Sequence, residues 1–129
     1  MKDFCIIGSG ISGATIAKAL SKKFSLDVYD KARGAGGRSS NKKLNKNESF
    51  DHGVQYISPK SIQFKNFIKD LINKKIVKNW LGRHLFLNTD KKEDKKHIKI
   101  IGKKGNNAIS KYLLKDINCN FNSEVIKIF

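Results

Sequence analysis

The sequence is poor in cysteine, proline and tryptophan, and it has no long apolar run. Its 129 residues include two cysteines, one proline and one tryptophan. Cys5 and Cys119 lack C-x-x-C spacing, so they form neither a disulfide framework nor a metal site. We expect both to be small buried residues, which fits a reducing cytoplasm. Only four apolar residues precede Gly8, too few for a signal peptide, and no segment approaches membrane-spanning length.

Acidic residues and arginines are also scarce. The 11 Asp and Glu residues against 27 Lys and Arg residues give a formal net charge of +16, and only Arg33, Arg38 and Arg83 are arginines, which leaves 24 lysines. The lysines are scattered beside Asn and Ile, whereas a dedicated nucleic-acid-binding protein clusters its charge and uses arginine forks. We therefore expect solvated lysine faces, no membrane partner and no specific nucleic-acid partner, with nonspecific adhesion at low salt. A basic nucleic-acid-binding module stays an alternative.

Glycine, in contrast, is concentrated in one turn. Residues 8–13 read GSGISG, a G-x-G-x-x-G pattern between the apolar run 4–7 and a helix-like segment. Gly8 permits a tight turn, Gly10 lets a pyrophosphate approach the backbone, and Gly13 lets the helix pack closely on the strand. The helix N-terminus, where Ser12 adds an amide or a hydroxyl, favours a phosphate group.

The chain after this turn strengthens the prediction. Residues 26–29 read as a second buried strand that ends in Asp30, where a carboxylate can accept hydrogen bonds from ribose hydroxyls. Residues 31–40 then read KARGAGGRSS, and Arg33 and Arg38 flank the Gly36-Gly37 pair. Because lysine is the default cation here, two arginines at this place indicate that a planar guanidinium fork matters. A plain NAD domain does not need this element, although an NAD(P)-dependent dehydrogenase would share the first 30 residues and stays an alternative.

These residues resemble the flavin-dependent amine oxidases, and within them the renalase-like oxidoreductases. The resemblance extends to FDHGVQY at residues 50–56, to residues 102–108 and to EVIKI at residues 124–128. It implies FAD as the cofactor, with the pyrophosphate at the glycine turn, ribose at Asp30, a phosphate at Arg38, the flavin ring near Gln55 and Tyr56, and adenine at the backbone of Val125. The cofactor-binding residues that it implies are Gly8, Gly10, Ile11, Ser12, Gly13, Asp30, Lys31, Gly37, Arg38, Gln55, Tyr56 and Val125.

Members of the resembling family are much longer than this chain. The resemblance therefore implies that residues 1–129 are the FAD-binding domain of a longer flavoprotein, with its substrate domain and C-terminal flavin segment absent and a complementing C-terminal chain as a partner. The implied reaction is oxidation of a reduced small-molecule substrate, a dihydronicotinamide or an amine, by hydride transfer to the flavin. A truncated, non-catalytic FAD-binding remnant is the alternative. No catalytic residue can be named, and His84 and His97 lack the third ligand of a metal site.

The periodicities predict an α/β fold: a Rossmann-type parallel sheet with flanking helices and a small antiparallel hairpin, apparently truncated. The expected strands are a central one over residues 2–7, then 26–29, 117–121 and 124–129, with a hairpin formed by 85–88 and 97–101. Ser58 and Pro59 should start a helix that runs to about Asn73, Asn107 should cap another, and residues 39–49 should be a mobile loop.

Overall fold

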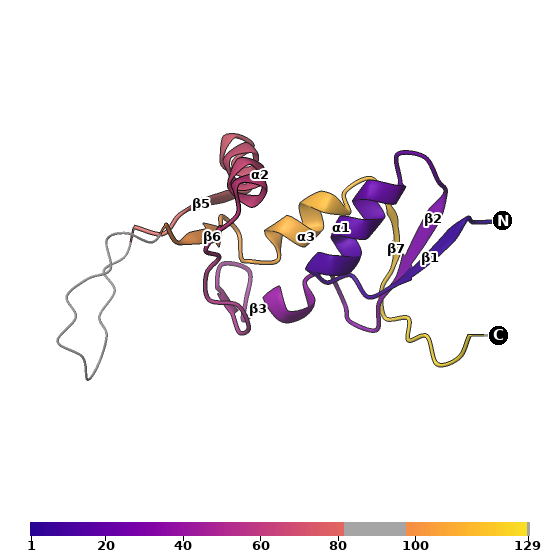
Figure 1. The fold of residues 1–129 in the computed structure, drawn as a ribbon. Helices are drawn as coiled ribbons and strands as arrows, with labels where there is room; N and C mark the ends of the chain where they lie inside the picture. The colour runs from indigo at the N-terminus through magenta and orange to yellow at the C-terminus, as the bar shows by residue number, and fades with distance from the viewer. Residues whose placement is uncertain (82–97, 129) are drawn as a thin grey trace.

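The computed structural model describes residues 1–81 and 98–128. Three strands, β1 (Phe4–Ile7), β2 (Leu26–Tyr29) and β7 (Asn118–Asn120), form a parallel sheet in the order β1-β2-β7. The helix α1 (Ile11–Leu20) lies against one face of this sheet, and α3 (Ala108–Leu113) lies against α1 (Figure 1). This arrangement confirms the predicted α/β, Rossmann-type fold.

Small side chains explain how closely these layers pack. Ala14 and Ala17 of α1 are fully buried, and with Leu26 and Val28 they belong to the core that α3 completes. Because side chains alternate between the two faces of a strand, Asp27 and Tyr29 point to the opposite face. Within the described residues, no helix covers that second face.

The prediction that residues 2–7 form the central strand, with burial on both faces, is wrong. β1 is an edge strand and β2 is the central one. Phe4 and Ile7 are 40% and 54% exposed, and Cys5 is exposed instead of buried. The run is apolar as predicted, but no other strand in the described part of the chain pairs with the outer edge of β1. Cys119, on β7, is half-buried.

A second structural unit holds α2 (Ile62–Asn73), β5 (Val77–Asn79) and β6 (Ile100–Gly102). α2 packs on β5, which pairs antiparallel with β6. The helix ends where it was predicted to end, but it begins three residues after the predicted start. Its N-cap is Ser61, whose hydroxyl accepts a hydrogen bond from the Phe64 N–H at 3.2 Å, so Ser58 and Pro59 stay outside the helix.

Residues 39–49 are not the loop that their polar composition predicted. They hold the end of a short 3₁₀ helix, η1 (Gly37–Ser39), and then an antiparallel hairpin of β3 (Asn41–Lys43) and β4 (Ser49–Asp51). The Asn45 side chain closes the hairpin by accepting hydrogen bonds from the N–H groups of Asn47 and Glu48. Polar residues can therefore form the strands because backbone and turn contacts, rather than apolar burial, hold them.

The C-terminal predictions have mixed outcomes. The strand over 117–121 is confirmed as β7, and Asn107 lies at the N-cap of α3, although its side chain makes no capping bond. The strand over 124–129 is wrong for the described residues: Asn122 adopts φ 54° and turns the chain away, and Ile126 and Ile128 are 91% and 78% exposed. The predicted strand 85–88 lies outside the described residues, and β6 pairs with β5.

Candidate functional site

The glycine turn joins β1 to α1 in the way its spacing predicts. Gly8 has φ +98°, a conformation that favours glycine, and its N–H donates to the Tyr29 carbonyl at 2.8 Å. A Cβ on Gly13 would lie 2.0 Å from the Gly8 carbonyl oxygen, so this glycine allows helix and turn to pack closely. Gly10 is the N-cap of α1, and no side chain caps the helix. The first N–H groups of α1 thus keep their donor capacity for a ligand.

Asp30 follows β2 and bonds back to the glycine turn. Its Oδ2 accepts from the Ser9 N–H at 2.6 Å and from the Ser9 hydroxyl, and its Oδ1 accepts from the Ala32 N–H at 2.8 Å. Burial of the Asp30 carboxyl raises its pKa, but the bonds from Ser9 and Ala32 outweigh burial and hold the pKa below its ordinary value. Asp30 is therefore a carboxylate at neutral pH, and it fixes the turn as well as facing the site.

The second glycine-rich segment folds directly onto the first. The Gly36 N–H donates to the Ser9 carbonyl at 3.1 Å, and Gly36 forms a parallel bridge with Gly10. Gly37 has φ +52°, and a Cβ there would lie 3.2 Å from the Gly10 Cα. Two loops that are more than twenty residues apart in sequence thus form one glycine-lined surface beside the start of α1.

Arg38 begins the exposed rim of this surface. Its carbonyl accepts from the Val54 N–H at 2.9 Å, and a Cβ on Gly53 would meet that carbonyl oxygen at 2.0 Å. Arg38 lines a shallow hollow with Gly37, His52, Gly53 and Val54. Its guanidinium makes no hydrogen bond or ion pair with another residue in the described ranges, so it remains available to an anion.

A second hollow lies at the carboxyl ends of β1 and β2. It has a volume of about 300 Å³, and its lining includes Gly8, Asp30, Lys31 and Val125. The Ser123 N–H donates to the Asp30 carbonyl at 3.0 Å, which holds the segment containing Val125 beside Asp30. Four residues of the predicted site therefore share one concave surface, although Val125 does not belong to a strand.

The structure places the remaining predicted residues in two different surroundings. Ile11 and Ser12 are exposed on the first turn of α1, next to the glycine surface. Gln55 and Tyr56 are also exposed, but the Tyr56 ring packs beside Trp80, with centroids 5.8 Å apart, and Lys99 lies 4.9 Å above it. These contacts belong to the β5–β6 side of the molecule and not to the glycine loops.

Asn106 and Asn107 hold the site together, a role that the sequence did not predict for either residue. Asn106 is buried; its side chain accepts from the Gly102 N–H and donates to the carbonyls of Val54 and Gln55. Asn107 is also buried and donates to the Ala35 carbonyl at 3.3 Å, while its Oδ1 accepts no hydrogen bond from the described residues. The only sign of this role in the sequence is the pair of consecutive asparagines before α3. Because the chain is rich in asparagine, that pair does not stand out.

The described residues contain neither a metal-binding cluster nor a membrane-spanning helix. No group of three His, Cys, Asp or Glu side chains there is placed to hold a metal ion. None of the helices in these ranges combines the length and the apolar character that crossing a bilayer requires.

Comparisons with known proteins found both similar solved structures and a matching family model. Three solved structures of putrescine oxidase, from a structure-based redesign of cofactor binding, are similar: a double mutant, a single mutant and the wild type bound to putrescine. Each is 26% identical over the matched part, with TM-scores of 0.49, 0.46 and 0.46. The first match covers 64% of this chain and 18% of the oxidase, and the other two cover 61% and 17%.

A family model provides the assignment. The model of the NAD(P)-binding Rossmann-like domain matches residues 6–71, about half of the chain. The matched region contains both glycine loops, Asp30 and Arg38. The chain therefore belongs to the family of NAD(P)-binding Rossmann-like domains.

Proposed function

We propose that this chain binds FAD and is part of a renalase-like flavin-dependent oxidoreductase. The observation that carries the proposal is the contact between the two glycine loops, in which Gly36 and Gly37 pack on Gly10. A dinucleotide turn alone needs only the first loop. The second loop brings Arg38 to the same surface, as the resemblance to the flavin-dependent amine oxidases implies.

The residues around the turn suit the adenosine diphosphate part of such a cofactor. A Cβ built on Gly10 would have only the Gly37 Cα near it, at 3.8 Å, so a phosphate group has room to approach the backbone. The Oδ1 of Asp30 accepts one hydrogen bond from the protein and keeps capacity for a ribose hydroxyl. Val125 lines the same hollow as Asp30, in a place that suits an adenine ring.

In this proposal the protein binds and orients the cofactor. The α1 N-terminus and Arg38 would hold the pyrophosphate, and Asp30 would hold the ribose. When bound, FAD supplies two-electron chemistry, the acceptance of a hydride from a reduced small molecule such as a dihydronicotinamide or an amine. Asn106 holds the carbonyls of Val54 and Gln55, and the Tyr56 ring packs beside Trp80, so Tyr56 would approach the flavin ring from the Trp80 side.

Competition binding tests the choice of cofactor. The purified chain, freed of bound nucleotide, is titrated with FAD, FMN, NAD⁺ and NADP⁺ while intrinsic fluorescence is followed. We expect FAD to bind most tightly, and FMN to bind weakly because it lacks the adenosine that Asp30 and Val125 would contact. Tighter binding of NAD⁺ or NADP⁺, the ligands in the family's description, would contradict the proposal and favour a nicotinamide-dependent dehydrogenase.

A further inference from the structure

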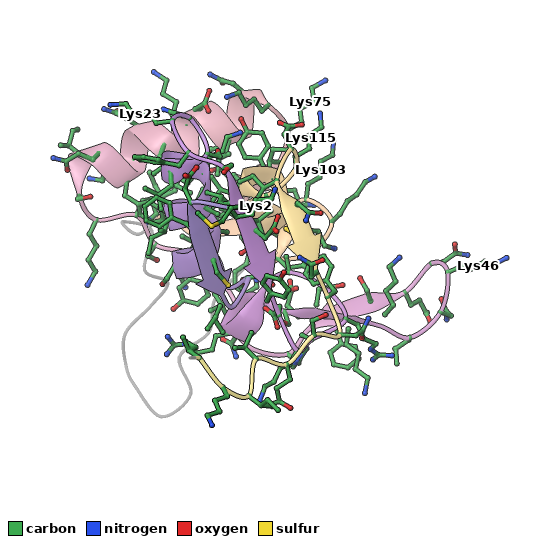
Figure 2. The ribbon with its side chains drawn as sticks, turned by 90° about the vertical axis from the view of Figure 1, so that its right-hand side faces the viewer. Lys2, Lys23, Lys46, Lys75, Lys103 and Lys115 are labelled. Atoms are coloured by element: carbon green, nitrogen blue, oxygen red, sulfur yellow. The ribbon has the colours of Figure 1, made fainter. Side chains whose placement is uncertain are left out.

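Five lysines surround one concave surface outside the dinucleotide site. The surface, here the lysine pocket, has a volume of about 450 Å³, and its cationic lining is Lys75, Lys103, Lys104, Lys111 and Lys115. They come from three places: the turn after α2, the turn after β6, and α3 with the residues that follow it. Figure 2 shows Lys75, Lys103 and Lys115 on the same side of the molecule, away from Lys46.

The positive charge of the lysine pocket is uncompensated. No acidic residue lines it, and none of its five lysines forms an ion pair with another residue in the ranges 1–81 and 98–128. The neighbouring cation Lys74 differs, because it pairs with Asp70 at 2.6 Å. Nearby Asp116 lies 3.9 Å from Lys18. Five like charges around one hollow repel each other, and an anion that enters the hollow relieves that repulsion.

The backbone of Lys75 points to the same surface. Lys75 has φ 58°, in the left-handed region, where it ends α2. Its N–H donates to the Ile72 carbonyl and the Ile76 N–H donates to the Leu71 carbonyl, both at 2.9 Å, a helix ending in which glycine is the usual residue. A side chain at this position has a steric cost. Strained residues of this kind concentrate at functional sites, and here the strain places a lysine at the rim of the pocket.

The lining also has an apolar part. Ile76 and Tyr112 are half-buried, and with Ala108 they lie among the lysines. The Nζ of Lys74 lies over the Tyr112 ring, 5.4 Å from the ring centroid, and this cation–π contact holds the ring in place. A hollow of this volume has the size of a small-molecule site, and lysine binds phosphate as a compact point charge. The ligand that these features suit is small, has several negative charges and has a flat or apolar portion.

We propose that the lysine pocket binds a nucleoside di- or triphosphate. The phosphates would lie among the five lysines and the nucleoside against Tyr112 and Ile76. The concave shape distinguishes this site from the extended positive track that a nucleic-acid strand needs. The proposal is independent of FAD binding, because none of the predicted cofactor-binding residues lines this pocket. Of the residues that support the dinucleotide site, Asn107 alone is also part of the lining.

The test uses ATP, inorganic triphosphate and a single-stranded oligonucleotide as probes on the full, isotope-labelled chain. Calorimetry gives affinities at low salt, and amide chemical shifts locate the bound probe. We expect ATP to shift the amides of residues 75–76, 103–104 and 108–115, and to bind more tightly than triphosphate. Lys75→Gly should weaken ATP binding about fivefold, and Lys75→Gly combined with Lys111→Ala about twentyfold. Lys46→Ala, in the β3–β4 hairpin, removes one charge elsewhere and should change affinity less than about twofold.

Three outcomes would overturn the proposal. The first is equal weakening by Lys75→Gly and Lys46→Ala, which would mean that only net charge matters. The second is ATP shifts confined to residues 8–13 and 30–38, because the ligand would then occupy the dinucleotide turn. The third is tighter binding of the oligonucleotide than of ATP with shifts at lysines over the whole surface. Lys75→Gly removes a strained residue, so a folding failure is not expected to obscure the result.

Discussion

Gly13 and Gly34 are matched probes of the site, because a methyl group would meet backbone at one and open space at the other. A Cβ on Gly13 would lie 2.0 Å from the Gly8 carbonyl oxygen, whereas nothing lies within 4 Å of a Cβ on Gly34. We expect Gly13→Ala to lower the free energy of unfolding by about 2 kcal/mol, despite the better helix propensity of alanine. Gly34→Ala should change it by less than about 1 kcal/mol. Urea unfolding measures both, and equal stabilities would contradict the close packing of turn and helix.

Arg38 tests whether guanidinium geometry or charge alone matters. If its fork contacts a cofactor phosphate, Arg38→Lys keeps the charge but loses the two-point contact. A charge-assisted hydrogen bond contributes about 1.5–3 kcal/mol, so FAD affinity should fall about ten- to a hundredfold. Lys42→Ala, on the neighbouring strand β3, should change affinity by less than about threefold. Fluorescence titration with FAD at fixed salt distinguishes the two possibilities. Equal FAD affinities of wild type and Arg38→Lys would mean that Arg38 contributes only its positive charge.

The Asp30 carboxylate predicts a defined acid response. Its pKa is lower in the folded chain than its ordinary value, so the folded state binds fewer protons and the stabilisation is complete above the unfolded pKa of about 3.9. It is lost as the pH falls below that value through the folded pKa. Asp30→Asn should therefore be less stable than wild type near neutral pH and lose less stability between about pH 5 and 2. Urea unfolding measured as a function of pH checks this prediction. The free energy of unfolding of the variant should still depend on pH, because the pKa values of Asp3 and Asp27 are also lowered.

At this scale the sequence was most informative where a backbone conformation permits only glycine. Gly8 and Gly13 have the conformation and the packing that the motif predicts. The site contacts of Asn106 and Asn107 escaped prediction because their partners, among them Val54 and Ala35, lie about fifty to seventy residues away. A side-chain amide gives no sign in the sequence of which distant carbonyl it will meet. Whether Gln55, Tyr56 and Val125 contact a cofactor stays a prediction.

The end of α2 gives a test at the scale of one element. Lys75 occupies a left-handed position that glycine adopts without steric cost. Lys75→Gly should raise the free energy of unfolding by up to about 1 kcal/mol, since the relief of strain exceeds the entropy lost with an added glycine. Lys74→Gly is the control: Lys74 has φ −78° and pairs with Asp70, so its replacement should destabilise. Thermal unfolding compares the two, and a loss of stability in Lys75→Gly would contradict the strain.

Elements were predictable where local apolar periodicity and tertiary burial agree. α1, β2 and the end of α2 follow their apolar spacing because those faces are buried. Apolar periodicity did not predict the β3–β4 hairpin, because backbone pairing and the turn at Asn45 stabilise it and neither depends on hydrophobic residues. Ser58 and Ser61 are both suitable N-cap residues, and the helix begins after Ser61, with Ile68 and Leu71 on its buried face.

For the whole molecule, the uncovered face of the parallel sheet bears on catalysis. Cys5 and Ile7 lie on β1, whose outer edge is unpaired in the described residues. We propose that the oxidoreductase is larger than this chain and that its other parts shield the site from water. Hydrogen peroxide release with dihydronicotinamide or amine substrates should therefore be negligible for the chain alone. Robust turnover, measured with FAD supplied, would contradict this proposal.

The position of β7 in the sheet also constrains the order in which the chain can fold. Phe4 pairs with Leu26, but Val28 pairs with Cys119, so the two strand pairs close loops of roughly 20 and 90 residues. The longer loop costs only about 1.3 kcal/mol more in closure entropy. Its larger consequence is for synthesis on the ribosome, where the second edge of β2 stays open while roughly 90 further residues are added, until β7 emerges. During that interval the nascent chain must hold β1, α1 and β2 together with one of the two strand pairs of the sheet still unmade.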